Sequence, residues 1–140
     1  MAKILIVDDE TSLAEVLGLF LSDCGHLVRT APTAKRALRL GRMFRPDVLI
    51  ADFCLLDDQD GGQVARALRA EDPSLHVILI TGLLVDEVHD SVADIPNLRL
   101  LGKPLDLDDV QRHVLELIAP TSPVPRQRSA RRSTPRVRSA

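Results

Sequence analysis

Three short runs of apolar residues constrain the fold of this chain most strongly. They lie within residues 3–7, 47–51 and 76–80, and each is followed at once by a polar residue. Runs of this length without polar alternation are typical of strands that are covered on both faces, as in a parallel sheet. Two less regular segments, residues 26–31 and 98–101, complete a set of five predicted strands.

Segments with helical periodicity separate the predicted strands. The predicted helices cover residues 11–24, 33–44, 63–70, 85–92 and a last segment after Asp106 or Asp108. The first would begin with Thr11 or Ser12 as its N-cap and would include Val16 in its buried apolar stripe. The alternation of strands and helices predicts an α/β fold. We expect a five-stranded parallel sheet, doubly wound as (βα)5 in the flavodoxin-like manner.

Charge divides the chain into two parts. Residues 1–118 hold 12 basic and 20 acidic residues, whereas residues 119–140 hold six arginines and no acid. We therefore assign a domain to residues 1–119 and a basic tail, rich in proline, serine and arginine, to residues 120–140. The tail has too few apolar residues to offset its ordering entropy, so we expect it to be disordered. Three interpretations stay open: a solvated extension, docking on an acidic surface, or weak, non-specific contact with nucleic acid.

The remaining composition excludes several classes of protein. The longest apolar runs fall far short of the roughly 20 residues that a membrane span needs. Met1 is not followed by a signal peptide, and the two cysteines show neither a metal-ligand spacing nor a disulfide framework. No glycine-rich turn follows the first strand, which disfavours nucleotide binding. We expect a cytoplasmic protein without membrane insertion.

Residues that can carry chemistry follow four of the predicted strands. Asp8 and Asp9 follow the first strand, Asp52 the third, Thr81 the fourth and Lys103 the fifth. Ligands of doubly wound sheets bind beyond the carboxyl ends of the strands, so these side chains should converge on one rim. Three adjoining carboxylates favour a hard cation such as Mg²⁺, and a lysine and a hydroxyl beside them suit phosphate. A carboxylate can itself attack phosphorus and form an acyl phosphate.

The same residues carry a resemblance to a known family. Asp8-Asp9-Glu10, Asp52, Thr81-Gly82 and Lys103-Pro104, each at the end of its own predicted strand, resemble the signature of receiver domains of bacterial two-component response regulators. The resemblance covers residues 3–118. It implies that Asp52 accepts a phosphoryl group from a histidine kinase or a histidine phosphotransfer protein in a phosphorelay.

The resemblance also implies a set of Mg²⁺ ligands. Asp9 would bind the ion directly and Asp8 largely through water. Asp52 and the backbone carbonyl of Cys54 would complete the protein ligands.

Two further side chains would act on the phosphoryl group itself. Thr81 would hydrogen-bond one of its oxygens, and Lys103 would pair with its charge, with a cis peptide bond before Pro104. Receivers usually meet their downstream targets on the face made by the fourth helix, the fifth strand and the fifth helix, so the same face is expected here.

Two positions depart from the family pattern. Family members commonly carry a tyrosine or phenylalanine where this chain has Leu100, so a switch based on ring movement is not expected. The loop after Asp52 commonly has a proline and a glycine at the places of Leu56 and Asp60, and here Gly61-Gly62 arrive late. Either one residue has been inserted or this acidic loop has a shape of its own.

Three functions compete for these residues. The first is a stand-alone receiver without a folded effector domain, which catalyses only its own phosphorylation and dephosphorylation and signals by binding other proteins. The second is a receiver-like adaptor that is not phosphorylated and binds partners constitutively; an adaptor has no need for crowded carboxylates. The third is a Mg²⁺-dependent phosphatase, which commonly needs a second carboxylate where this chain has Cys54. We favour the first.

Overall fold

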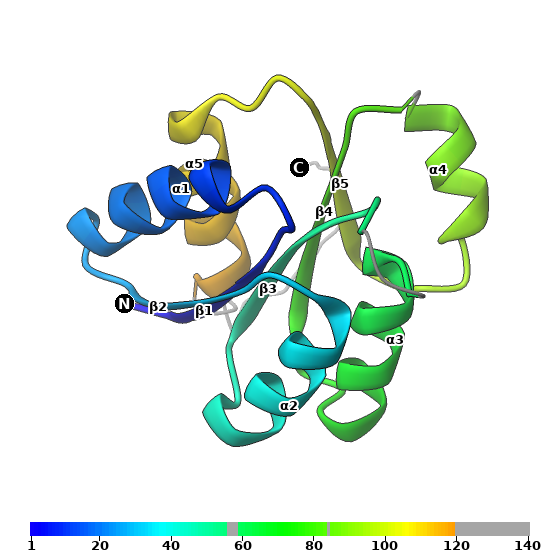
Figure 1. Ribbon diagram of the computed structural model, residues 1–140, viewed down its shortest axis with the longest axis horizontal. Coiled ribbons are helices and arrows are strands. Elements are labelled where there is room, and N and C mark those ends of the chain that lie inside the picture. Colours follow the sequence, from blue (N-terminus) through cyan, green and yellow to red (C-terminus); the bar gives the residue numbers. More distant parts are fainter. Residues whose placement is uncertain (56–58, 84, 120–140) are drawn as a thin grey trace, which may run out of the picture.

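Five parallel strands form the centre of the structure, a computed structural model that describes residues 1–55, 59–83 and 85–119. Their order in the sheet is β2-β1-β3-β4-β5 (Figure 1). The strands are β1 (Lys3–Val7), β2 (Leu27–Ala31), β3 (Val48–Asp52), β4 (His76–Thr81) and β5 (Leu98–Gly102). The chain passes from β1 to one edge and then back across to β3, so the sheet is doubly wound. The predicted fold is confirmed.

Helices of the described residues cover both faces of this sheet. They are α1 (Thr11–Asp23), α2 (Ala34–Phe44), α3 (Gly61–Glu71), α4 (Val85–Ser91) and α5 (Leu107–Ile118). α1 and α5 pack on one face, and α2, α3 and α4 pack on the other (Figure 1). Ile4 and Ile6 of β1 face the first layer, and Leu5 and Val7 face the second. Because both faces are covered, this strand is apolar at successive positions.

Helix α1 differs from its prediction at its start and on its surface. It begins at Thr11, and neither predicted N-cap acts as one; Glu10 holds that position without a side-chain hydrogen bond to the helix. The buried residues of the helix are Ala14, Leu17 and Leu21. Val16 is 52% exposed. The apolar stripe of α1 is wider than the surface it buries, so Val16 at its margin stays in solvent.

Helix α3 begins two residues earlier than predicted, at Gly61. Asp60 is its N-cap: the carboxylate accepts from the N–H of Gln63 at 2.9 Å, and the Gln63 side chain accepts from the N–H of Asp60 at 2.8 Å. This capping box satisfies two backbone donors and determines where the helix starts. Two glycines in the first turn have low helix propensity, which hid this start in the sequence.

Some of the predictions fall on residues that the structure does not describe. They concern the basic tail, residues 120–140, and residues 56–58 of the acidic loop. Within the described ranges, every helix is too short or too polar to cross a lipid bilayer.

Candidate functional site

The residues predicted to form the site follow the carboxyl ends of neighbouring strands. Asp8 comes directly after β1, Asp52 ends β3, Thr81 ends β4 and Lys103 follows β5. The strands are in parallel register, with Asp52 opposite Ile80 and Thr81 opposite Gly102. All four ends therefore lie along one rim of the sheet, as the sequence predicts.

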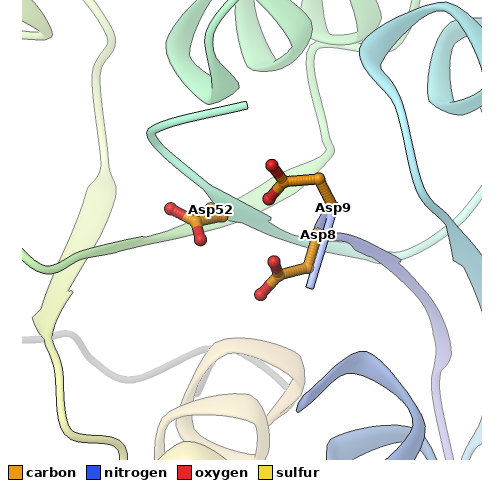
Figure 2. A group of neighbouring side chains, drawn as sticks. All are labelled: Asp8, Asp9 and Asp52. Carbon is orange, nitrogen blue, oxygen red and sulfur yellow. The ribbon is translucent and has the colours of Figure 1, made fainter. Parts of the chain in front are cut away.

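Three carboxylates meet at this rim. Asp8, Asp9 and Asp52 each offer an oxygen, and these three oxygens lie within 4.8 Å of one another (Figure 2). Asp8 and Asp52 are each only 4% exposed, whereas Asp9 is half-buried. Buried carboxylates at such spacing repel one another unless a cation or a proton offsets their charge.

The environment of Asp8 disfavours the ionised form of its carboxyl group. The pKa of the Asp8 carboxyl is raised to about 6, chiefly by burial and also by the neighbouring Asp52, although the hydrogen bond from the N–H of Glu10 lowers it. That hydrogen bond joins Glu10 N to Asp8 Oδ1 at 2.9 Å. Asp8 therefore holds a proton more tightly than an exposed aspartate does, and a bound cation at the rim would compete with that proton.

The Asp52 carboxylate is held at both oxygens. Lys103 Nζ donates to Oδ2 at 2.7 Å, and the backbone N–H of Cys54 donates to Oδ1 at 3.1 Å. Partial burial would lower the pKa of the Lys103 ammonium, but the hydrogen bond and the attraction to Asp52 and Asp8 outweigh it, so that pKa is raised. Lys103 therefore stays charged beside the carboxylates at any physiological pH.

Lys103 and Thr81 are joined through their backbones. The Lys103 N–H donates to the carbonyl of Thr81 at 2.8 Å, and the Lys103–Pro104 bond is cis, as expected. Thr81 is fully buried, and its Oγ1 accepts from the N–H of Leu83 at 2.9 Å. This bond uses an oxygen lone pair, so the hydroxyl hydrogen remains able to donate to an anion.

Gly61, to which the sequence interpretation gave no role, contacts the backbone of Asp52 and Phe53. The N–H of Gly61 donates to the carbonyl of Phe53 at 2.9 Å. A Cβ atom on Gly61 would lie 2.3 Å from the carbonyl oxygen of Asp52, which no side chain can tolerate. The start of α3 therefore packs directly on the peptide that carries Asp52. The sequence signal was the capping-box pattern Asp60-x-x-Gln63 around the two glycines.

Leu100, a position where the sequence departs from the family pattern, belongs to the core. Leu100 of β5 lies opposite Leu79 of β4 and packs, partly buried, against the core beneath α2, α3 and α4. An aliphatic side chain at this place has no polar end to exchange between core and solvent.

Comparison with known proteins now identifies the family. The family model of the response regulator receiver domain matches residues 4–115. The chain belongs to this family. Receiver domains act in two-component signalling, where they interact with histidine kinases or phosphotransfer proteins and typically bind Mg²⁺ at an acidic pocket. In this receiver, Asp8, Asp9 and Asp52 form an acidic cluster at the rim of the sheet.

Curated relatives of this receiver are longer proteins. It is 33% identical over 120 residues to a probable transcriptional regulatory protein of Mycobacterium tuberculosis, TcrX, which covers 84% of this chain and 50% of that protein. It is 36% identical over 107 residues to the probable transcriptional regulator ycf27 of Guillardia theta, and this match covers 76% of this chain and 37% of that protein. The receiver thus spans at most about half of the length of these two relatives.

Solved structures share the architecture. A response regulator receiver domain protein from Clostridium thermocellum superposes with a TM-score of 0.78 at 25% identity, over 84% of this chain and 94% of that one. The chemotaxis protein CheY4 of Vibrio cholerae gives a TM-score of 0.77 at 24% identity, over 84% and 99% of the two chains. These likenesses support the flavodoxin-like receiver fold described above.

Proposed function

We propose that this receiver accepts a phosphoryl group on Asp52 from a histidine kinase or a histidine phosphotransfer protein and signals by binding other proteins. One observation carries the proposal: the Asp52 carboxylate lies between the Lys103 ammonium and two further carboxylates on one rim. A carboxylate nucleophile, a cation and a place for a metal ion are what transfer of a phosphoryl group to an aspartate requires.

The donor set of the rim fits Mg²⁺. The ion prefers carboxylate and carbonyl oxygens, and Asp8, Asp9 and Asp52 supply three carboxylates that a single ammonium does not balance. Asp9 and Asp52 would bind it directly, Asp8 largely through water, and Cys54 would contribute its backbone carbonyl. Bound there, Mg²⁺ would supply neutralisation of the charge on the transferred group.

Each residue of the rim has a defined part in the transfer. An oxygen of Asp52 attacks phosphorus, the phosphorus–nitrogen bond of the donor phosphohistidine breaks, and its electron pair returns to the imidazole. Lys103 then pairs with a phosphoryl oxygen in place of Asp52 Oδ2, and the Thr81 hydroxyl donates to another. Hydrolysis of the acyl phosphate resets the domain, so the chain catalyses only its own phosphorylation and dephosphorylation.

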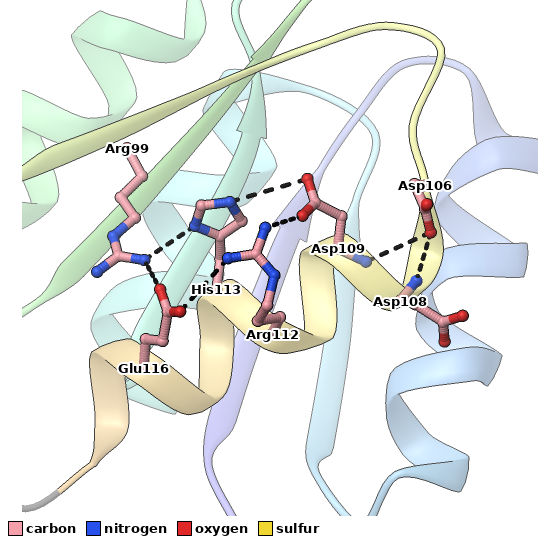
Figure 3. A network of polar contacts seen from close by, with 7 residues as sticks. All are labelled: Arg99, Asp106, Asp108, Asp109, Arg112, His113 and Glu116. Carbon is pink, nitrogen blue, oxygen red and sulfur yellow. Dashed lines mark hydrogen bonds and ion pairs between the residues drawn. The ribbon is translucent and has the colours of Figure 1, made fainter.

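The output face in this proposal is formed by α4, β5 and α5. Several charged residues of β5 and α5 are already paired within the domain (Figure 3): Arg99 of β5 donates to His113 at 2.9 Å and pairs with Glu116, which also contacts Arg112 at 3.4 Å. The hydrogen bond from Arg99 keeps the pKa of Glu116 below its ordinary value. A partner on this face has to exchange these pairs for its own, which favours selectivity over affinity.

Movement of Thr81 toward the phosphoryl group would link the rim to this face. Thr81 hydrogen-bonds the loop that leads to α4 through Leu83, so a shift of the hydroxyl also shifts the loop. With Leu100 in the core, the signal would pass through this loop rather than through a ring.

The proposal is tested by incubating the chain with MgCl₂ and acetyl phosphate and measuring its intact mass. We expect a gain of one phosphoryl group that requires Mg²⁺ and is lost in Asp52→Asn. The control Asp23→Asn, an exposed carboxylate at the far end of α1, should be phosphorylated normally. Absence of any gain in the native chain would contradict the proposal and favour a constitutive adaptor.

The division of the chain belongs to the same proposal. We assign the receiver to residues 1–119 and propose that the basic tail, residues 120–140, takes no part in the chemistry. Removing the tail should leave phosphorylation of Asp52 unchanged. Loss of phosphorylation after this deletion would show that the tail belongs to the site.

A further inference from the structure

One segment of the acidic domain has the opposite charge. Residues 24–46 contain six arginines and lysines and no acid, although residues 1–118 as a whole carry a formal charge of −8. This segment contains β2, an edge strand of the sheet, and α2, which contacts it. The basic residues of this segment are therefore carried by two elements that lie in contact.

The exposed side chains of this segment form one surface, which we call the α2–β2 face. Its members are Leu27, Arg29, Arg36, Arg39 and Met43, all of them exposed. The three on α2 follow one another at helical spacing, so they share a stripe. β2 adjoins the end of this helix: the guanidinium of Arg29 lies 5.4 Å from the ring centre of Phe44, the last residue of α2.

The arginines of this face are not neutralised by the domain. Among the described residues, neither Arg36 nor Arg39 has a carboxylate partner. Arg42, at the side of α2 toward α3, differs because it pairs with Glu71 at 2.8 Å. Arg36 and Arg39 can therefore pair with carboxylates of another molecule.

Two exposed apolar side chains indicate what kind of anion this face suits. Met43 is 78% exposed and Leu27 is 41% exposed. Arginine and methionine are enriched where proteins bind proteins, whereas a nucleic acid backbone gains little from methionine and leucine. The negative charge of the rest of the domain also opposes a long polyanion more than a short acidic segment.

We propose that the α2–β2 face is a docking surface for a segment of a partner protein in which acidic residues flank an apolar one. Arg36 and Arg39 would pair with the carboxylates, and Met43 and Leu27 would cover the apolar side chain. β2 and β5 are opposite edges of the sheet, so this partner can bind while another occupies the face of α4, β5 and α5. The surface goes beyond the proposed function and does not depend on phosphorylation of Asp52.

The test is a binding titration of the full chain with two labelled peptides of equal length and charge. In the first, glutamates flank leucines; in the second, serines replace the leucines. We expect the first to bind more tightly, and Arg36→Glu combined with Arg39→Glu to weaken it about tenfold or more. Met43→Ser should abolish the preference for leucine. The control Arg112→Glu, on α5, should change the affinity by less than about twofold.

Three results would overturn the proposal. One is absence of peptide binding, or equal affinity of the peptide for the native chain and for the variant with Arg36→Glu and Arg39→Glu. Folding of the variants is checked by circular dichroism and by phosphorylation with acetyl phosphate. Another is tighter binding of duplex DNA than of the leucine peptide, with the DNA affinity depending equally on Arg36 and Arg39. That result would make this a phosphate-binding surface. The last is self-association that the charge reversal abolishes, which would make the occupant a second copy of the chain.

Discussion

Asp8 gives the most direct test of the electrostatics of the rim. Its pKa is raised from 3.8 to about 6, and each tenfold change in proton affinity corresponds to about 1.4 kcal/mol. With the carboxylate ionised and no cation bound, the native state is therefore destabilised by about 3 kcal/mol relative to a chain in which Asp8 is neutral. The variant Asp8→Asn removes this charge and keeps an oxygen to accept from the N–H of Glu10.

The sign of the pH dependence follows from the raised pKa. The native state binds the proton of Asp8 more tightly than the unfolded state, so this group stabilises the fold fully below pH 3.8. That contribution is lost as the pH rises through about 6. Between about pH 5 and about pH 7.5, the native chain should lose roughly 1.4 kcal/mol that Asp8→Asn does not lose.

The assay is urea unfolding in the presence of a chelator at both pH values, for the native chain, Asp8→Asn and the control Asp23→Asn. The control should follow the native chain. Adding MgCl₂ at the higher pH should stabilise the native chain more than Asp8→Asn, because the ion binds the folded state. If the native chain and Asp8→Asn lose stability in parallel between the two pH values, the pKa of Asp8 is not raised in the native state.

Further predictions concern packing, charge and capping around Asp52. Gly61→Ala should lower the free energy of unfolding by about 2 kcal/mol or more, because its Cβ would overlap the Asp52 carbonyl. The control Gly18→Ala should not destabilise the chain, because its Cβ would meet nothing closer than 3.7 Å. Equal losses of stability in the two variants would refute the argument from close approach. Lys103→Met should slow phosphorylation of Asp52 by acetyl phosphate about 100-fold, and an unchanged rate of mass gain would remove the ammonium from the mechanism. Asp60→Ala should cost about 1 kcal/mol in urea unfolding and Asp60→Asn much less; similar losses would show that the cap is not the cause.

The fold and the members of the rim were accessible from the sequence because the two depend on the same pattern. A buried parallel strand must be apolar throughout, so the first polar residue marks where the strand leaves the core. Asp8 and Asp52 are visible for that reason, and Thr81 ends its strand in the same way. The topology then determines that these ends are neighbours.

What escaped prediction depends on contacts that no local pattern encodes. Val16 has the spacing of a core residue, but how much of α1 the sheet covers is decided by packing. The role of Gly61 follows from a backbone approach between segments that the loop brings together. The α2–β2 face does not follow from the net charge of the domain, because twenty acidic residues outweigh the basic residues of this face in the sum.

The hydrogen bond from Gly61 to Phe53 closes the base of the loop that follows Asp52. Because the two ends of this loop are tied to each other beside Asp52, residues can be gained, lost or exchanged between them without displacing its carboxylate. Under the proposed function, evolution can thus change which kinase or target recognises this corner of the protein, while Asp52 stays in place beside Lys103 and the carboxylates of Asp8 and Asp9.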